Sequence, residues 1–300
     1  MSEDEEEEEC PSLAADTLFV NRYKVIKKLG GGTFGKVYEV KDTKEHKTYA
    51  LKIELAGTEN SVLKVEAMIM RKFRKRHKHF THLIDAGNYG KLNYVVMSLV
   101  GKSIDNIRKD RPTKCFSLIT TLRLGQQCLQ ALKDLHGVGY LHRDVKPSNY
   151  ALGRTPNHRR VYLIDFGLAR QFMLGLNKLR PPRRPAPFRG TAIYCTIRVH
   201  EGYEQGPQDD LGSLLYAMVE MLHGKLPWQG EKDDSVLHER KRNTPSGELF
   251  KGFPDKIVAM YETLQNYDYN SIIDYKYFHS CFEKMLKKFK VNDEDPFEWE

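Results

Sequence analysis

The 300-residue sequence lacks any hydrophobic run of about 18 residues, the length that a membrane-spanning helix needs. Its N-terminus is acidic and has no apolar segment of the kind found in secretory signals. The five cysteines are scattered and none forms a C-x-x-C pair, which argues against a disulfide framework and against a zinc site. We therefore expect an intracellular protein with reduced thiols and no membrane span, located in the cytoplasm or also in the nucleus.

Charge is unevenly distributed along the chain. There are 48 Lys and Arg residues against 40 Asp and Glu, a formal net charge of +8. Seven acidic groups lie in residues 3–9, so the remainder has 48 basic against 33 acidic groups, or +15. Because a like-charge run repels itself and buries little, residues 1–19 are predicted to form a disordered acidic tail. The basic remainder favours an acidic partner: nucleic acid, a membrane surface, or an acidic or phosphorylated peptide. Nucleic acid is disfavoured, since the basic run at 71–78 has few aromatic residues near it.

A glycine-rich stretch follows a strand-like segment that begins at Tyr23. Gly30, Gly32 and Gly35 have the G-x-G-x-x-G spacing. In a dinucleotide-binding fold a helix would open at the third glycine, but residues 36–40 alternate and are β-branched, which indicates a second strand. The loop is therefore expected to be a flap between antiparallel strands, whose backbone amides can approach phosphate oxygens. Taken alone, the motif fits an ordinary hairpin equally well.

A lysine interrupts the next apolar strand, at residues 48–53. Lys52 is therefore expected to be buried, and a buried cation needs a carboxylate partner. A helix is predicted from Asn60 to about Phe73, and its apolar face includes Glu66. The sequence thus predicts a buried ion pair between Lys52 and Glu66.

A polar loop at residues 140–149 lies between apolar segments, and Asp165 follows a short strand. Asp144 can accept the proton of an attacking hydroxyl, and Lys146 can lie beside a migrating phosphoryl group. Asn149 and Asp165 offer hard oxygen ligands for Mg²⁺. The alternative is an ordinary polar turn, which would have to match the H-R-D-x-x-x-x-N and D-F-G spacing by coincidence.

The remaining pattern divides the chain into two parts. An apolar segment at 93–101 ends a small β-rich region, and the sequence after it becomes helical. Helices are predicted at 118–135, 208–222, about 235–241, 254–263 and 275–288. We therefore expect an α+β domain at 20–300, with a β-rich N-terminal lobe (20–98), a hinge (98–101) and a larger, mainly helical C-terminal lobe (102–300). A nucleotide is expected in the cleft between the lobes.

Together and in this order, these motifs resemble those of eukaryotic protein kinases over about residues 20–290. The sequence Lys-Pro-Ser-Asn at 146–149 is similar to the serine/threonine-specific form of the catalytic loop. At 190–200 the chain has G-T-A-I-Y-C-T-I-R-V-H in place of the usual A-P-E ending, which is similar to the casein-kinase-one group. Residues 180–183 and 188–191 further resemble the tau-tubulin kinases.

The resemblance implies a two-lobed protein-kinase fold that uses ATP and Mg²⁺ to phosphorylate serine and threonine hydroxyls of protein substrates. It makes Asp144 the catalytic base, Lys146 a γ-phosphate contact, Asn149 both a catalytic residue and a metal ligand, and Asp165 the second metal ligand. Asp210 would brace the catalytic loop. The residues implied in ATP binding are Gly30, Gly32, Gly35, Val37, Ala50, Lys52, Glu66, Met97, Ser98, Leu99 and Val100.

Two departures from the group concern the substrate side. Ile193 stands where casein-kinase-one members usually have an arginine that helps to bind an anion, and Arg198 where they usually have an asparagine. At that point the resemblance alone therefore does not establish the group's preference for acidic or phosphorylated substrates. The segment before these residues is instead rich in positive charge. Its candidate substrate-binding residues are Lys178, Arg180, Arg183, Arg184, Arg189 and Thr191. They fit either an acidic or phosphorylated substrate or a solvated basic loop stiffened by prolines.

The segment between Asp165 and Thr191 contains no Ser, Thr or Tyr. Phosphorylation before Thr191 is therefore chemically excluded, and Arg143, which pairs with such a phosphate in many kinases, has no partner of that kind. We expect a constitutively competent enzyme that is monomeric. The alternative is a pseudokinase-type scaffold, whose usual mark is loss of the strand lysine, the base or a metal ligand, although all of these residues are present.

Overall fold

The computed structural model describes residues 9–300 apart from 33–34, 58–60, 74–76, 176–177 and 293. The chain divides into two compact units. The N-terminal unit comprises the chain up to residue 76 together with 81–100, and the C-terminal unit comprises 77–80 together with 101–300.

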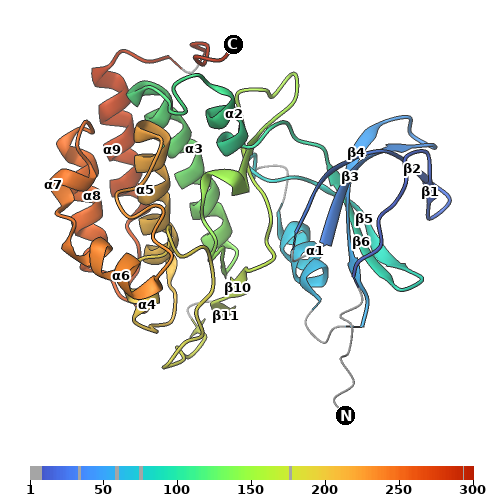
Figure 1. Cartoon of the computed structure of the whole chain (residues 1–300), viewed down its shortest axis with the longest axis horizontal. Coiled ribbons are helices and arrows are strands. Elements are labelled where there is room, and N and C mark those ends of the chain that lie inside the picture. The colour runs from blue at the N-terminus through green and yellow to red at the C-terminus, as the bar shows by residue number, and fades with distance from the viewer. Residues whose placement is uncertain (1–8, 33–34, 58–60, 74–76, 176–177, 293) are drawn as a thin grey trace. The chain divides into compact units, whose positions relative to one another are not determined.

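The N-terminal unit is built on an antiparallel sheet in the order β1-β2-β3-β4-β6-β5 (Figure 1). Its strands are β1 (Leu18–Phe19), β2 (Tyr23–Gly32), β3 (Gly35–Asp42), β4 (Thr48–Leu55), β5 (Leu83–Tyr89) and β6 (Leu92–Ser98). Aromatic and β-branched side chains from neighbouring strands form one buried cluster, which includes Tyr38, Val40, Leu51 and Ile53.

Helix α1 (Val62–Lys72) packs against β4, β5 and β6. Its buried side chains, among them Leu63, Ile69 and Met70, recur at the spacing of an amphipathic helix. The N-cap is Ser61, whose hydroxyl accepts a hydrogen bond from Lys64 N. The helix predicted from the sequence is therefore present, while the expected first residue, at position 60, lies outside the described residues.

Part of the segment predicted to be a disordered tail is folded. Residues 1–8 lie outside the described residues. β1 pairs with β2, and Cys10 and Leu13 pack against the buried cluster of the sheet. The backbone N–H of Asp16 donates to Val25 O at 2.8 Å. The predicted tail, 1–19, is therefore too long, because the apolar residues that follow the acidic run have a hydrophobic surface to cover.

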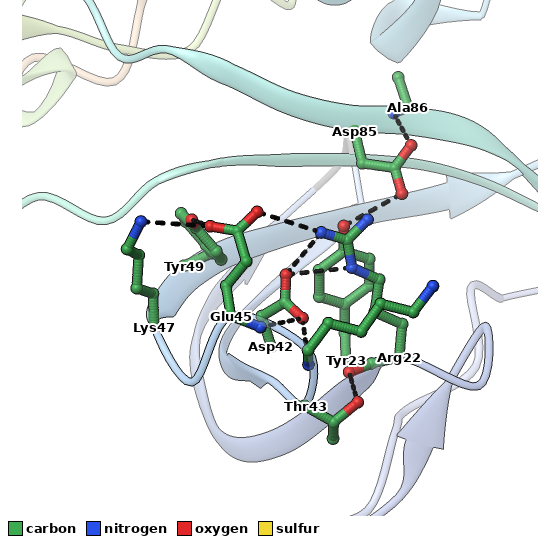
Figure 2. Close-up of polar contacts among 10 residues, drawn as sticks. Arg22, Tyr23, Asp42, Thr43, Glu45, Lys47, Tyr49, Asp85 and Ala86 are labelled. Atoms are coloured by element: carbon green, nitrogen blue, oxygen red, sulfur yellow. Dashed lines mark hydrogen bonds and ion pairs between the residues drawn. The ribbon is translucent and has the colours of Figure 1, made fainter.

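A polar network fastens the turn between β3 and β4 (Figure 2). Arg22 donates from Nε and Nη2 to Asp42 Oδ2 at 3.0 and 2.7 Å, and Asp42 Oδ1 accepts from Lys44 N at 2.8 Å. The hydrogen bond from Arg22 is the main reason that the pKa of the buried Asp42 lies below its usual value. Tyr23 Oη donates to Asp85 Oδ2 at 3.0 Å and so links β2 to β5.

The C-terminal unit is mainly helical. In the described part of the chain its helices are α2 (Ile104–Asp110), α3 (Leu118–Gly137), α4 (Ile197–His200), α5 (Pro207–His223), α6 (Asp234–Asn243), α7 (Ser246–Leu249), α8 (Asp255–Gln265) and α9 (Tyr275–Lys288). α3 packs against both α5 and α9 (Figure 1). Every residue of α5 from Pro207 to Met221 is buried, so this helix forms the centre of the unit. The helices predicted from the sequence are confirmed, with ends that differ by at most two residues.

Among the described residues of the C-terminal unit, three short antiparallel strand pairs shape the loops. They are β7 (Tyr140–Leu141) with β10 (Arg170–Gln171), β8 (Tyr150–Leu152) with β9 (Val161–Leu163), and β11 (Met173–Gly175) with β12 (Lys178–Leu179). The first two pairs bring the polar loop after β7 beside the segment after β9. The expected α+β class is thus confirmed. Within the residues that the structure describes, no helix combines the length and the apolar character that a membrane crossing requires.

Candidate active site

Asp210 on α5 fixes the start of the loop at 142–149 through hydrogen bonds to its backbone. The buried carboxylate accepts hydrogen bonds from the backbone N–H groups of His142 (2.7 Å) and Arg143 (2.8 Å) and from Nε2 of His136 (2.8 Å). Burial alone would raise the pKa of Asp210, but the hydrogen bond from His136 and the other donors hold it below its usual value. One negative charge therefore orients two consecutive amides of the loop.

His142 and Phe166 join this loop to the segment after β9. Nδ1 of His142 accepts from Asp144 N at 3.3 Å, and Nε2 lies 3.2 Å from Ile164 O, so these partners assign the ring proton to Nε2. The His142 ring meets Phe166 edge to face, and Phe166 is stacked on Phe80. Because His142 and both phenylalanine rings are buried, this packing fixes the position of the loop relative to the segment after β9.

Asp144 belongs to a cluster of three polar side chains. Its Oδ1 accepts from Thr191 Oγ1 at 2.7 Å, and its Oδ2 lies 2.7 Å from Lys146 Nζ. Lys146 also donates to Thr191 Oγ1 at 2.8 Å. The cluster gives the proton of an alcohol an acceptor and places a cation beside it. Thr191 is 45 residues from Lys146, so only the fold brings it into the cluster.

Asn149 and Asp165 are brought close by the β8–β9 pair. Ile164 N donates to Asn149 O at 2.9 Å, beyond the end of the ladder. The side-chain Nδ2 of Asn149 donates to Asp144 O (2.8 Å) and Oδ2 (3.1 Å), which directs the amide oxygen away from Asp144. One amide oxygen and one carboxylate are a donor set that fits Mg²⁺, an ion that protein sites commonly hold through one or two carboxylates together with substrate phosphates.

Lys52 and Glu66 form the ion pair predicted from the sequence. Lys52 Nζ lies 2.8 Å from Glu66 Oε2, and the side chains are only 8% and 3% exposed. Glu54, another acid on β4, has different partners, since it accepts from Leu63 N at 3.1 Å and from Asn93 Nδ2 at 2.9 Å. The pair joins β4 to α1, and each charge holds the other in place because neither is solvated.

The glycine-rich segment includes the end of β2 and the start of β3, and residues 33–34 between the two strands lie outside the described residues. Gly35 has a φ of +112°, and a Cβ there would lie 2.0 Å from Ile53 O, so the position requires glycine. The other residues implied in ATP binding, besides Glu66 on α1, lie on this sheet or directly after it: Gly30 and Gly32 on β2, Val37 on β3, Ala50 and Lys52 on β4, Met97 and Ser98 on β6, then Leu99 and Val100. The candidate residues thus form two groups, and each is organised by contacts within its own unit.

The basic residues predicted to bind substrate differ in their solvent exposure and in whether they pair with other groups of the protein. Three of them are exposed: Lys178, Arg184 and Arg189. Arg180 is half-buried, and its Nε donates to a backbone carbonyl at 2.9 Å. Arg183 binds Glu204 through two hydrogen bonds of 2.6 and 2.9 Å. Arg183 is therefore paired with Glu204, while its side chain remains 36% exposed.

Sequence reasoning missed Lys241 on α6. Its Nζ is buried and donates to Ala192 O at 2.6 Å and to Cys195 O at 2.5 Å, and it lies over the rings of Tyr216 and Trp228. Burial lowers the pKa of Lys241 to about 7. These bonds hold the segment that follows the threonine of the catalytic cluster. The sequence carries no signal for this role, because α6 is polar and strongly basic at its end, which is the usual pattern of a solvated helix.

His200 lies beside this lysine. Its Nε2 is 3.2 Å from Lys241 Nζ and 3.2 Å from Ala192 O, and its ring stacks on His238. Burial, followed by the charge of Lys241, lowers the pKa of His200 to about 4. The imidazole is therefore neutral at physiological pH.

Comparison with known proteins places this geometry in a family. A protein kinase domain matches residues 23–288. A probable serine/threonine-protein kinase of Dictyostelium discoideum is 35% identical over 289 residues, which cover 96% of this chain but only 58% of that protein. The serine/threonine-protein kinase spe-6 of Caenorhabditis elegans is 34% identical over 288 residues, covering 93% of this chain and 76% of that protein. A casein kinase I candidate of C. elegans is 31% identical over 296 residues, covering 96% and 86%. The chain therefore belongs to the protein kinase family, among its serine/threonine kinases.

Proposed function

We propose that the chain transfers the γ-phosphate of ATP to serine and threonine hydroxyls of protein substrates. The observation that carries this proposal is the mutual contact of Asp144, Lys146 and Thr191 at 2.7–2.8 Å. The cluster stands on a loop that Asp210 orients, and the Lys52–Glu66 pair is intact. A scaffold that only binds partners would not need the cluster of Asp144, Lys146 and Thr191.

Each group has a chemical role in this proposal. Asp144 accepts the proton of the incoming hydroxyl, a general-base contribution of about 10²- to 10⁴-fold. Lys146 offsets negative charge that develops on the transferred group. Mg²⁺, when bound with the nucleotide, neutralises phosphate charge. Asn149 and Asp165 would hold it through their oxygens, and Asn149 in addition fixes the rotamer of Asp144 through its amide nitrogen.

The test compares wild-type protein with Asp144→Asn, using ATP labelled in the γ-phosphate and casein as acceptor. The variant keeps the shape of the side chain but loses its basicity, so phosphate incorporation should fall by about 10²-fold or more. Asp233→Asn is the matched control, because this exposed N-cap residue accepts from Ser235 N at 2.8 Å and asparagine caps equally well. If wild type incorporates no more phosphate than Asp144→Asn while still being stabilised by Mg²⁺ and ATP, the scaffold alternative replaces this proposal.

We further infer that the enzyme belongs to the casein-kinase-one group, near the tau-tubulin kinases, and prefers acidic or phosphorylated substrates. The sequence at 190–200 supports the subgroup, as does the casein kinase I candidate among the relatives. The exposed Lys178, Arg184 and Arg189 support the preference. The double variant Arg184→Ala/Arg189→Ala should raise KM for an acidic peptide and leave KM for a neutral peptide unchanged. An equal effect on both peptides would refute the preference.

We also infer that activity needs no phosphate in the segment between Asp165 and Thr191, since that segment has no hydroxyl-bearing side chain. Protein treated with a phosphatase and shown by mass spectrometry to be unmodified should keep full activity. Loss of activity together with a phosphate mapped to Thr191 in the untreated protein would contradict this inference.

A further inference from the structure

Three arginines from separate segments of the C-terminal unit lie close enough for their charges to interact. Arg143 belongs to the loop, Arg170 lies on β10, which pairs with the strand directly before the loop, and Arg183 lies in the proline-rich segment. Burial, followed by the charges of Arg170 and Arg183, lowers the pKa of Arg143 to about 10. All three stay protonated at neutral pH, so the arrangement needs an anion to offset their repulsion.

A single carboxylate binds two of these arginines. Glu204 has a side chain only 3% exposed. Its oxygens accept from Arg183 Nε (2.6 Å), Arg183 Nη2 (2.9 Å) and the backbone N–H of Arg183 (3.2 Å), and Arg170 Nε lies 3.8 Å away. Burial would raise the pKa of Glu204, but the hydrogen bonds from Arg183 hold it below its usual value, so the group is ionised.

Arg143 is affected by Glu204 without being bound to it. The Arg143 Nε donates to Leu168 O at 2.7 Å, and its backbone N–H donates to Asp210. Its φ of +65° is unfavourable for a residue with a side chain, so this backbone conformation depends on such contacts. Among the charges around the Arg143 guanidinium, Glu204 and Asp210 are the negative ones that favour its charged form.

We propose that Glu204 supplies from within the fold the negative charge that an activation-segment phosphate supplies in kinases regulated by phosphorylation, and thereby positions Arg143 and the catalytic loop. The hydroxyl-free segment between Asp165 and Thr191 offers no residue that could carry such a phosphate. This inference rests on the proposed kinase function. Glu204 is a positioning residue, because its hydrogen bonds go to Arg183 and none of them reaches the Asp144 cluster.

The first experiment measures kcat and KM of Glu204→Gln in the full chain. Loss of the charge should reduce kcat by about 10- to 100-fold through misplacement of the loop, with little change in KM for ATP. Glu201→Gln is the matched control, because Glu201 is more exposed and pairs with Arg242 away from the three arginines. A Glu204→Gln enzyme with wild-type kcat overturns the inference.

A second experiment separates positioning from simple loss of structure. Glu204→Ala leaves space for a small anion beside the arginines, so added sulfate should raise its kcat and its thermal midpoint relative to chloride at equal ionic strength, while wild type shows neither gain. The double variant Glu204→Gln/Arg183→Gln removes one charge of each sign and should recover part of the lost kcat. If sulfate gives no gain and the double variant is no better than the single one, Glu204 has a structural role only and the inference fails.

Failure of the proposed function has a different signature. In that case wild type transfers no more phosphate than Asp144→Asn, whereas sulfate still raises the thermal midpoint of Glu204→Ala if Glu204 neutralises the arginines.

Discussion

Replacement of Asp210 by asparagine should destabilise the C-terminal unit by about 3–5 kcal/mol. Oδ2 accepts from His136 Nε2 and His142 N, and Oδ1 accepts from Arg143 N, at 2.7–2.8 Å. In the variant one of these oxygens becomes an NH₂ group that faces a donor. A buried charge-assisted hydrogen bond of about 1.5–3 kcal/mol is lost, and the remaining bonds become weaker because their acceptor is neutral.

Tryptophan fluorescence during urea unfolding measures this effect. Both tryptophans, Trp228 and Trp299, lie in the C-terminal unit, so their signal follows that unit. The expected loss corresponds to a decrease of about 1–2 M in the urea midpoint. Because the pKa of Asp210 is lowered in the folded state, its contribution is present above the pKa of an unfolded aspartate, about 4, and is lost as the pH falls through the folded-state value.

The same substitution at Asp233 provides the control. Asp233 also accepts from two backbone N–H groups, at 2.8 and 3.4 Å, but it is exposed at the start of α6. Asp233→Asn should change the midpoint by less than about 0.2 M. If Asp210→Asn shifts the midpoint no further than this control, Asp210 does not brace the loop as described.

Three further changes have defined outcomes. Lys52→Met should destabilise the N-terminal unit by about 3 kcal/mol, because it leaves Glu66 buried without its partner. Adding Glu66→Leu should recover much of that loss. If the effects of the two substitutions on the free energy of unfolding are simply additive, the two side chains do not stabilise each other as an ion pair. Gly190→Ala should lower kcat by about tenfold, since φ is +113° and the new Cβ would lie 2.5 Å from Arg143 O, while retained activity would show that the loop adapts. For His200 the folded-state pKa of about 4 lies below the ordinary 6.5, so the stability it confers is present above pH 6.5 and is lost as the pH falls toward 4. Allowing for its partial exposure, His200→Gln should remove about 1–2 kcal/mol of that acid destabilisation, measured as the difference in thermal midpoint between pH 7 and pH 5.

The elements and the ion pair of the N-terminal unit were predictable because each rests on local pattern. Glu66 is a carboxylate on an apolar helical face, so the partner of Lys52 followed from the need to neutralise a buried charge. The helices of the C-terminal unit followed from apolar spacing in the same way, and α9 begins and ends at the predicted residues. The acidic tail was predicted too long because charge dominates its composition, whereas Cys10 and Leu13 decide where packing starts.

The contacts that complete the candidate site join residues far apart in the chain, and no local pattern in the sequence indicates them. The segment that contains Arg183 has no periodicity, and Glu204 is 21 residues away, so their pairing could not be derived from spacing. Lys241 lies on a helix whose composition indicates exposure, yet its ammonium group is buried and lies over the rings of Tyr216 and Trp228. Electrostatic pairs between loop residues can be predicted only after the topology of the strands and helices is known.

The burial of α5 from Pro207 to Met221 has a consequence for how the C-terminal unit opens. An amide exchanges its hydrogen with solvent only when its element opens, and helices without a solvent face open last. α5 should therefore be the most slowly exchanging helix, whereas α6 and α7 exchange early. Asp210 lies on that helix, so partial unfolding that releases the outer helices leaves the anchor of the catalytic loop in place. Native-state hydrogen exchange would then find the amides of His142 and Arg143 protected together with α5, in one cooperative unit.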